Sequence, residues 1–135
     1  MPIRLRYNMD IGISSSSLEQ KDLGNARFEA VTDGFGEGGT RKFTLAASAT
    51  DVPLDLGNVA TARFIAISTN AKDPTMDPVE ITVVTNVITD KPMPVTPMDN
   101  TKQGHLMMST SGLTALWATN PGTVDMEVVL FVGGD

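Results

Sequence analysis

His105 is the only histidine in the chain, so any Ser-His-Asp relay must use it. Such a relay also needs a nucleophile exposed on a strained turn, and the sequence has no Gly-x-Ser-x-Gly segment that would form one. Serine, threonine and aspartate are spread along the whole chain, so their presence near His105 is not informative. We expect a structural or surface histidine, and a small hydrolase centred on it is the third functional alternative.

Two groups of acidic residues raise the question of metal binding or acid-base chemistry. Asp73, Asp77 and Glu80 supply the oxygen ligands that calcium prefers, but the alternating acids and the sixth-position glycine of an EF-hand loop are missing. Asp125 and Glu127 would lie about 7 Å apart on one side of a strand, a spacing that an inverting glycosidase tolerates. An Asp-Pro turn explains the first group, and the solvent face of a strand explains the second. We therefore predict no metal site and no catalytic residue, and the protein is not expected to be an enzyme.

The glycine-rich segment Gly34–Gly39 invites comparison with phosphate-binding loops. It lacks the Gly-Lys-Ser/Thr ending of a Walker A loop, and a dinucleotide-binding turn would be followed by a helix. The residues that follow, Thr40–Phe43, instead have the pattern of a strand. We predict a flexible loop between two strands and no cofactor.

Sugar binding would require exposed aromatic side chains, and the two candidates are Trp117 and Tyr7. Trp117 lies within an apolar strand pattern, which favours a core or interface role. Tyr7 is the better surface candidate. A carbohydrate-binding module is therefore the second function to be tested.

Length, charge and composition narrow the class of protein. The 135 residues predict a single β domain, 1–135, large enough to fold around a core without metals or disulfides. The absence of cysteine excludes a disulfide framework and a thiolate zinc site. The net charge is −6 and the ten lysines and arginines form no basic stripe, so we expect neither nucleic acid nor a membrane as partner. Because no targeting segment is visible, we expect a soluble protein made in the cytoplasm.

Alternation of apolar residues with period two is the strongest structural signal. It is clearest over Thr123–Val132, where every even-numbered residue from 124 onward is apolar and the opposite face begins with two acids. The opposite face then turns apolar at Val129 and Phe131, so we expect this strand to end buried on both sides or against a neighbouring subunit. The other predicted strands are Ile3–Tyr7, Arg27–Val31, Arg41–Ala46, Ala62–Thr69, Pro78–Thr85, Asn86–Thr89, His105–Ser109 and Leu113–Thr119.

The remaining segments read as connections. A Thr-Asn dipeptide at 69–70, 85–86 and 119–120 predicts three strand ends, because asparagine bonds its own backbone and tolerates the left-handed region. Lys91–Asn100 contains three prolines and predicts an extended, polyproline-like crossover. Ser17–Gln20 matches a helix capping box, with Gly24 as a stop. These signals predict an all-β chain, a jelly-roll-like antiparallel β-sandwich or small barrel with at most one short helix.

Two stretches, Pro53–Asn70 and Gly112–Val132, resemble parts of small structural proteins of tailed bacteriophages. The resemblance covers roughly Asp51 to Asp135 and is one of pattern. It implies a capsid decoration or cement protein of jelly-roll type, located in the virion and made in the host bacterial cytoplasm. It also implies the major capsid protein or other virion proteins as partners, and a homodimer or homotrimer. A tail-spike, fibre or connector module is the alternative within the virion.

In this interpretation two segments are the expected contact elements. Residues 1–10 form an extended N-terminal arm or edge strand, with Ile3, Leu5 and Tyr7 on one face that could add to the sheet edge of a neighbour. Met93 and Met98 in the proline-rich crossover are the other predicted partner contacts, because unbranched thioether side chains suit adaptable surfaces. Gap filling in the core explains the methionines equally well.

Overall fold

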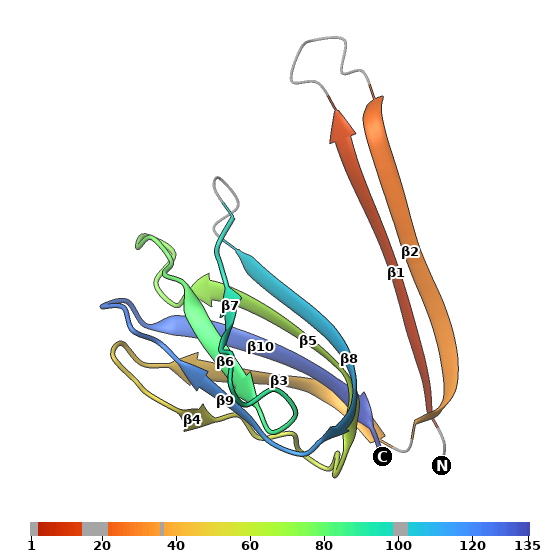
Figure 1. Ribbon diagram of the computed structural model, residues 1–135. Helices are drawn as coiled ribbons and strands as arrows, with labels where there is room; N and C mark the ends of the chain where they lie inside the picture. The colour runs from red at the N-terminus through yellow and green to blue at the C-terminus, as the bar shows by residue number, and fades with distance from the viewer. Residues whose placement is uncertain (1–2, 15–21, 36, 99–102) are drawn as a thin grey trace. The chain divides into compact units, whose positions relative to one another are not determined.

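The computed structural model describes residues 3–14, 22–35, 37–98 and 103–135. These residues form ten strands and no helix (Figure 1). The chain divides into two compact units, 1–35 and 36–135. The prediction of one domain over 1–135 with an arm at 1–10 stays a prediction.

The first unit is an antiparallel hairpin of two long strands, β1 (Ile3–Ser14) and β2 (Asp22–Phe35). The predicted strands Ile3–Tyr7 and Arg27–Val31 lie inside β1 and β2. The register pairs Tyr7 with Ala30 and Ile11 with Ala26, with irregularities near the two ends of β1. The capping box at 17–20 lies outside the described residues, and Gly24 lies within β2, so it does not end a helix.

The second unit is an eight-stranded sandwich of two antiparallel sheets. Sheet I has the order β3-β10-β5-β8 and sheet II the order β4-β9-β6-β7, and Figure 1 shows the two stacked face to face. The strands are β3 (Glu37–Leu45), β4 (Val52–Pro53), β5 (Ala62–Ala71), β6 (Ile81–Thr85), β7 (Met93–Val95), β8 (Gly104–Leu113), β9 (Leu116–Thr119) and β10 (Met126–Gly134).

The pairing of these eight strands is nested. The first pairs with the last (β3 with β10), the second with the seventh (β4 with β9), the third with the sixth (β5 with β8) and the fourth with the fifth (β6 with β7). A long hairpin wound on itself in this way is the topology of a jelly roll. The predicted all-β, jelly-roll-like sandwich is therefore confirmed.

The core lies between the sheets and follows the predicted alternation. Met126, Val128, Leu130 and Val132 are at most 1 % exposed, and residues of both sheets pack around them. β10 lies between β3 and β5 in sheet I. The opposite face of β10 is half-buried through Phe131, and the strand ends in the buried Gly133 and Gly134.

Two predicted connections form strands instead. Gly38 and Gly39 of the predicted glycine loop belong to β3, where they pair with Gly133 and Val132 of β10. Met93–Val95 of the predicted crossover forms β7 and pairs with β6. Pro94 is tolerated there because β7 is an edge strand, whose outward N–H groups have no ladder partner.

One predicted strand is absent. Asn86–Thr89 forms bends, because the hydroxyl of Thr85 accepts hydrogen bonds from the amides of Val87 (3.2 Å) and Ile88 (2.9 Å) and so turns the chain. Thr85-Asn86 and Thr119-Asn120 do mark strand ends, as predicted, while β5 continues past Thr69-Asn70 to Ala71.

The single strand predicted over Leu113–Thr119 is divided between β8 and β9. β8 ends at Leu113, directly after Gly112, whose φ of +80° is in the left-handed region. The side-chain oxygen of Asn86 accepts hydrogen bonds from the amides of Thr114 (2.8 Å) and Ala115 (3.1 Å). The connection between the strands is therefore fixed by a side chain from the loop after β6.

Candidate interaction surfaces

The hairpin has one apolar face. Residues paired across an antiparallel ladder share a face, and the register of β1 with β2 brings apolar or small residues together along the length of the hairpin. The successive pairs on this face are Leu5 with Thr32, Tyr7 with Ala30, Met9 with Phe28, Ile11 with Ala26, and Ile13 with Gly24. With 12 residues at about 3.3 Å each, β1 is roughly 40 Å long.

The other face of the hairpin is mostly polar. It pairs Asp10 with Arg27 and Asn8 with Glu29. Among the described residues of unit 1, β1 and β2 are the only elements, and no other element of that unit covers either face of the hairpin. Ile3, Leu5 and Tyr7 all lie in β1, as the sequence indicates. Leu5 and Tyr7 share the apolar face, while Ile3 precedes an irregularity in the register.

The outer face of sheet I carries an apolar cluster at its centre. The register aligns Phe131 of β10 with Ala66 of β5, and Ala66 with Met107 of β8. The rings of Phe131 and Phe64 meet edge to face with centroids 6.0 Å apart, and Phe64 is 6 % exposed. Met107 is 40 % exposed, so the cluster becomes accessible toward β8.

Polar residues border this cluster. Lys42 of β3 lies 3.4 Å from Glu127 of β10, which explains Glu127 as a surface ion pair. His105 is exposed on β8 and stands beside Ser68 of β5 in the ladder. Within the described residues no hydrogen bond joins His105 to Ser68, so they are not arranged as a base and a nucleophile.

Trp117 lies on the outer face of sheet II. It is half-buried and is aligned with Pro53 of β4 and Val84 of β6. Its neighbours in β9, Leu116 and Ala118, point into the core at 1 % exposure. The indole is therefore partly accessible beside Pro53 and Val84. This position allows contact with either a protein partner or a glycan.

Met93 is the first residue of β7, and Met98 follows the end of that strand. Met93 is half-buried and packs against the core. Met98 is 60 % exposed, and its amide donates to the carbonyl of Gln103 at 2.9 Å. Their role as partner contacts stays a prediction.

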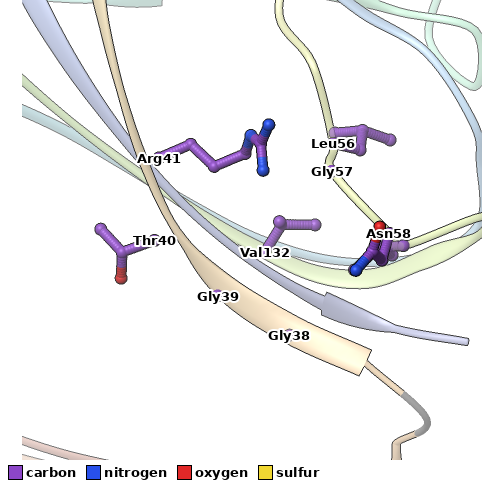
Figure 2. A pocket seen from close by; sticks show the side chains of 9 residues that line it. Gly38, Gly39, Thr40, Arg41, Leu56, Gly57, Asn58 and Val132 are labelled. Carbon is purple, nitrogen blue, oxygen red and sulfur yellow. The ribbon is translucent and has the colours of Figure 1, made fainter.

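A small pocket opens between β3 and the loop after β4. Its volume is about 100 Å³, and Figure 2 shows the Arg41 side chain extending from β3 toward Leu56 and Gly57. A guanidinium nitrogen of Arg41 lies 2.9 Å from a carboxylate oxygen of Asp55. Gly57 has a φ of +68°, and a Cβ there would lie 2.6 Å from the guanidinium. The pocket is too small for an organic ligand of ordinary size, and its ion pair lies at the surface.

Two open depressions flank Met76 in the loop after β5, with volumes of about 500 and 340 Å³. The chain turns at Asp73, whose carboxylate accepts hydrogen bonds from the Thr75 amide (2.9 Å) and hydroxyl (2.8 Å). These bonds, the amide first, lower the pKa of Asp73 below its ordinary value. This is the turn that the sequence predicts.

The other acids of interest have local partners. Glu80 accepts a hydrogen bond from the Thr96 hydroxyl at 2.6 Å, and Asp125 accepts one from the Ala47 amide at 2.8 Å. Among the described residues, no three histidine, aspartate or glutamate side chains are grouped so that they could hold a metal ion.

The described residues include no helix that is long and apolar enough to cross a membrane. In comparisons with known proteins, the chain matches no protein-family model, no curated protein and no solved structure. The resemblance to virion proteins therefore stays a prediction.

Proposed function

We propose that this protein is a structural subunit that acts by contact within a larger assembly, as a capsid decoration protein of a tailed phage. The apolar face of the hairpin carries the proposal. A two-stranded hairpin is marginally stable in water, and the mostly apolar and small residues that share one face of β1 and β2 over about 40 Å favour packing against another surface. Its opposite, mostly polar face suits solvent.

The nature of the assembly is inferred from the sequence pattern. The jelly-roll topology agrees with the fold that the resemblance to phage virion proteins implies, although a fold alone does not specify a function. A decoration protein repeats on a symmetric shell, where many modest contacts give durable attachment through effective concentration. The expected partner is the major capsid protein.

The experiment compares two neighbouring substitutions that each introduce a charged residue, on opposite faces of β1. Tyr7→Asp places a carboxylate on the apolar face, and Asn8→Lys places an ammonium group on the polar face, opposite Glu29. The two proteins are added to purified phage heads that lack the protein, and bound copies are counted after sedimentation. We expect Tyr7→Asp to bind at least tenfold more weakly, because burying one large apolar side chain is worth roughly 1.5–3 kcal/mol.

Asn8→Lys should bind as the unchanged protein does. Equal binding of both variants would reject the hairpin as the contact element. If the unchanged protein labels tails or fibres in electron micrographs and not heads, the decoration role is wrong.

The position of Trp117 supports a second candidate, glycan binding by a fibre or spike module. Titration of its fluorescence with oligosaccharides tests this candidate, because a sugar stacked on a partly accessible indole changes its emission. An unchanged spectrum at saturating sugar counts against it.

A further inference from the structure

Three of the four edges of the sandwich are protected against pairing with another chain. An exposed edge offers unpaired N–H and C=O groups, and natural proteins block such edges with short strands, prolines or charges. β4 has two residues including Pro53, and β7 has three including Pro94. β3 is nine residues long, but Arg41 and Lys42 stand exposed on it.

The fourth edge, β8, has none of these features. It is ten residues long and contains no proline, lysine, arginine, aspartate or glutamate. The longer stretch from Gln103 to Val124, which includes β8, also contains no lysine, arginine, aspartate or glutamate. The chain as a whole has a net charge of −6. In the part of the chain that the structure describes, β8 has a strand on one side only.

The geometry of β8 also favours pairing. From Gly104 to Ser109 it keeps a continuous ladder with β5, and the irregularity follows only between Ser109 and Leu113. A regular segment directs the N–H and C=O groups of alternate residues outward at even spacing. This segment is therefore a template on which another strand can add.

The side chains of β8 leave apolar surface at this edge. Met107 is 40 % exposed on the outer face of sheet I. Leu106 and Met108 pack against the core but remain half-buried, because no strand lies beyond them in sheet I. A strand added to β8 would cover these three residues.

We propose that β8 pairs with β8 of a second copy of this chain, antiparallel and around a two-fold axis. Such an interface is self-complementary, since each copy offers the same strand to the other. A register with Met107 opposite Met107 places His105 opposite Ser109, so no like-charged pair of lysine, arginine or acidic residues forms. The same pairing through β3 would bring Arg41 and Lys42 of both copies together. The absence of charged residues therefore favours a dimer joined through β8 over one joined through β3.

The dimer joins two four-stranded sheets into one continuous sheet. The pairing also places Met107 of one copy beside Met107 of the other. The apolar clusters on the outer faces of the two sheets then meet at these residues. The inference does not depend on the proposed function, because the purified protein alone tests it.

The first experiment measures the mass of the full chain by light scattering after gel filtration. We expect twice 14.3 kDa for the unchanged protein and 14.3 kDa for Met107→Lys, which sets two ammonium groups opposite each other. Thr44→Lys is the matched control, because Thr44 is exposed on β3 at the other long edge of sheet I. It should leave the dimer intact. Mixing Met107→Lys with Met107→Glu should restore a dimer that contains one copy of each.

The second experiment uses the absence of cysteine from the chain. Met107→Cys and Thr44→Cys are each treated with diamide, which oxidises two thiols to a disulfide. Residues directly opposite in an antiparallel pair have Cβ atoms about 4.5–5.5 Å apart, close enough for cross-linking after a small adjustment. We expect a covalent dimer from Met107→Cys within the time in which Thr44→Cys stays monomeric.

Several results would overturn the proposal. A monomeric wild-type protein rejects it, as does a dimer that survives Met107→Lys with unchanged melting temperature. A trimer also rejects it, because a two-fold pairing cannot close a ring of three. If Tyr7→Asp dissolves the dimer while Met107→Lys does not, the interface lies in the hairpin.

Discussion

Replacing Asn120 by alanine should destabilise the sandwich strongly. Asn120 follows β9 directly and is fully buried. Its amide nitrogen donates to the carbonyls of Leu45 at 3.2 Å and Val124 at 2.8 Å. Its amide oxygen accepts from the amide of Gly122 at 3.0 Å. One side chain thus joins the end of β3 to the turn before β10.

The magnitude follows from these three bonds. A neutral hydrogen bond contributes about 1 kcal/mol net, and a buried group left without a partner costs about 1–3 kcal/mol. Water can reach the groups at Gly122 and Val124, which are part-buried, more easily than the carbonyl of Leu45. We therefore expect Asn120→Ala to lower the free energy of unfolding by about 3 kcal/mol. For a domain of the size of the sandwich, residues 36–135, that loss corresponds to a drop in Tm of roughly 12–24 °C.

Urea unfolding followed by the fluorescence of Trp117 is the appropriate assay, because Trp117 is the only tryptophan and lies in β9. Asn58→Ala is the control, since Asn58 is exposed and its replacement should change stability by less than about 0.5 kcal/mol. A loss below about 1 kcal/mol for Asn120→Ala would refute the reasoning, because water would then replace the amide without cost.

Asn120→Asp adds a test with a defined sign. Its second oxygen would face the carbonyls of Leu45 and Val124, and burial favours the protonated acid. The folded-state pKa of the new acid is then raised above its unfolded value. The variant should therefore be most stable below the unfolded pKa, and it should lose stability as the pH rises from there through the raised folded-state pKa. A variant whose stability does not change with pH relative to Asn120→Ala would contradict this account.

Two further changes test smaller features. The hydroxyl of Thr69 is buried without a hydrogen-bond partner among the described residues, so Thr69→Val should stabilise the protein by about 1 kcal/mol in urea unfolding; a destabilised variant would show that the hydroxyl is bonded. Thr75→Val removes one of the two donors to Asp73, so the pKa of that carboxyl should rise toward its ordinary value in an NMR titration, and an unchanged pKa would exclude the hydroxyl as a cause. Since the pKa is lowered in the folded protein, these bonds stabilise the loop above the ordinary pKa, and their contribution is lost as the pH falls through the lowered value.

The features that the sequence predicts correctly are local ones. The alternation over Met126–Val132 specifies both the strand and its buried face, because a period of two leaves no other arrangement of these side chains. In β1 the prediction of Ile3–Tyr7 is correct but too short, because the alternation continues through Met9, Ile11 and Ile13 to the end of the strand at Ser14.

The features that sequence reasoning missed depend on distant partners. Gly38 and Gly39 form a strand because β10 lies beside them, and no local signal reveals that neighbour. Residues 86–89 have strand propensity, but the hydroxyl of Thr85 competes for their amides. The uncharged stretch around β8 is visible in the sequence, yet only the sheet order shows that it forms an edge.

The nested strand order has a consequence for the timing of folding. β10 is the last strand of the sandwich to be synthesised, and it occupies the slot between β3 and β5 at the centre of sheet I. Until β10 leaves the ribosome, β3 and β5 have no strand between them, and sheet I lacks its central strand. Pairings between distant segments also form slowly, because a long loop must close before any contact stabilises it. The sandwich should therefore fold in one late step, after β10 has been synthesised, and other chains can pair with the incomplete sheet I until that step is complete.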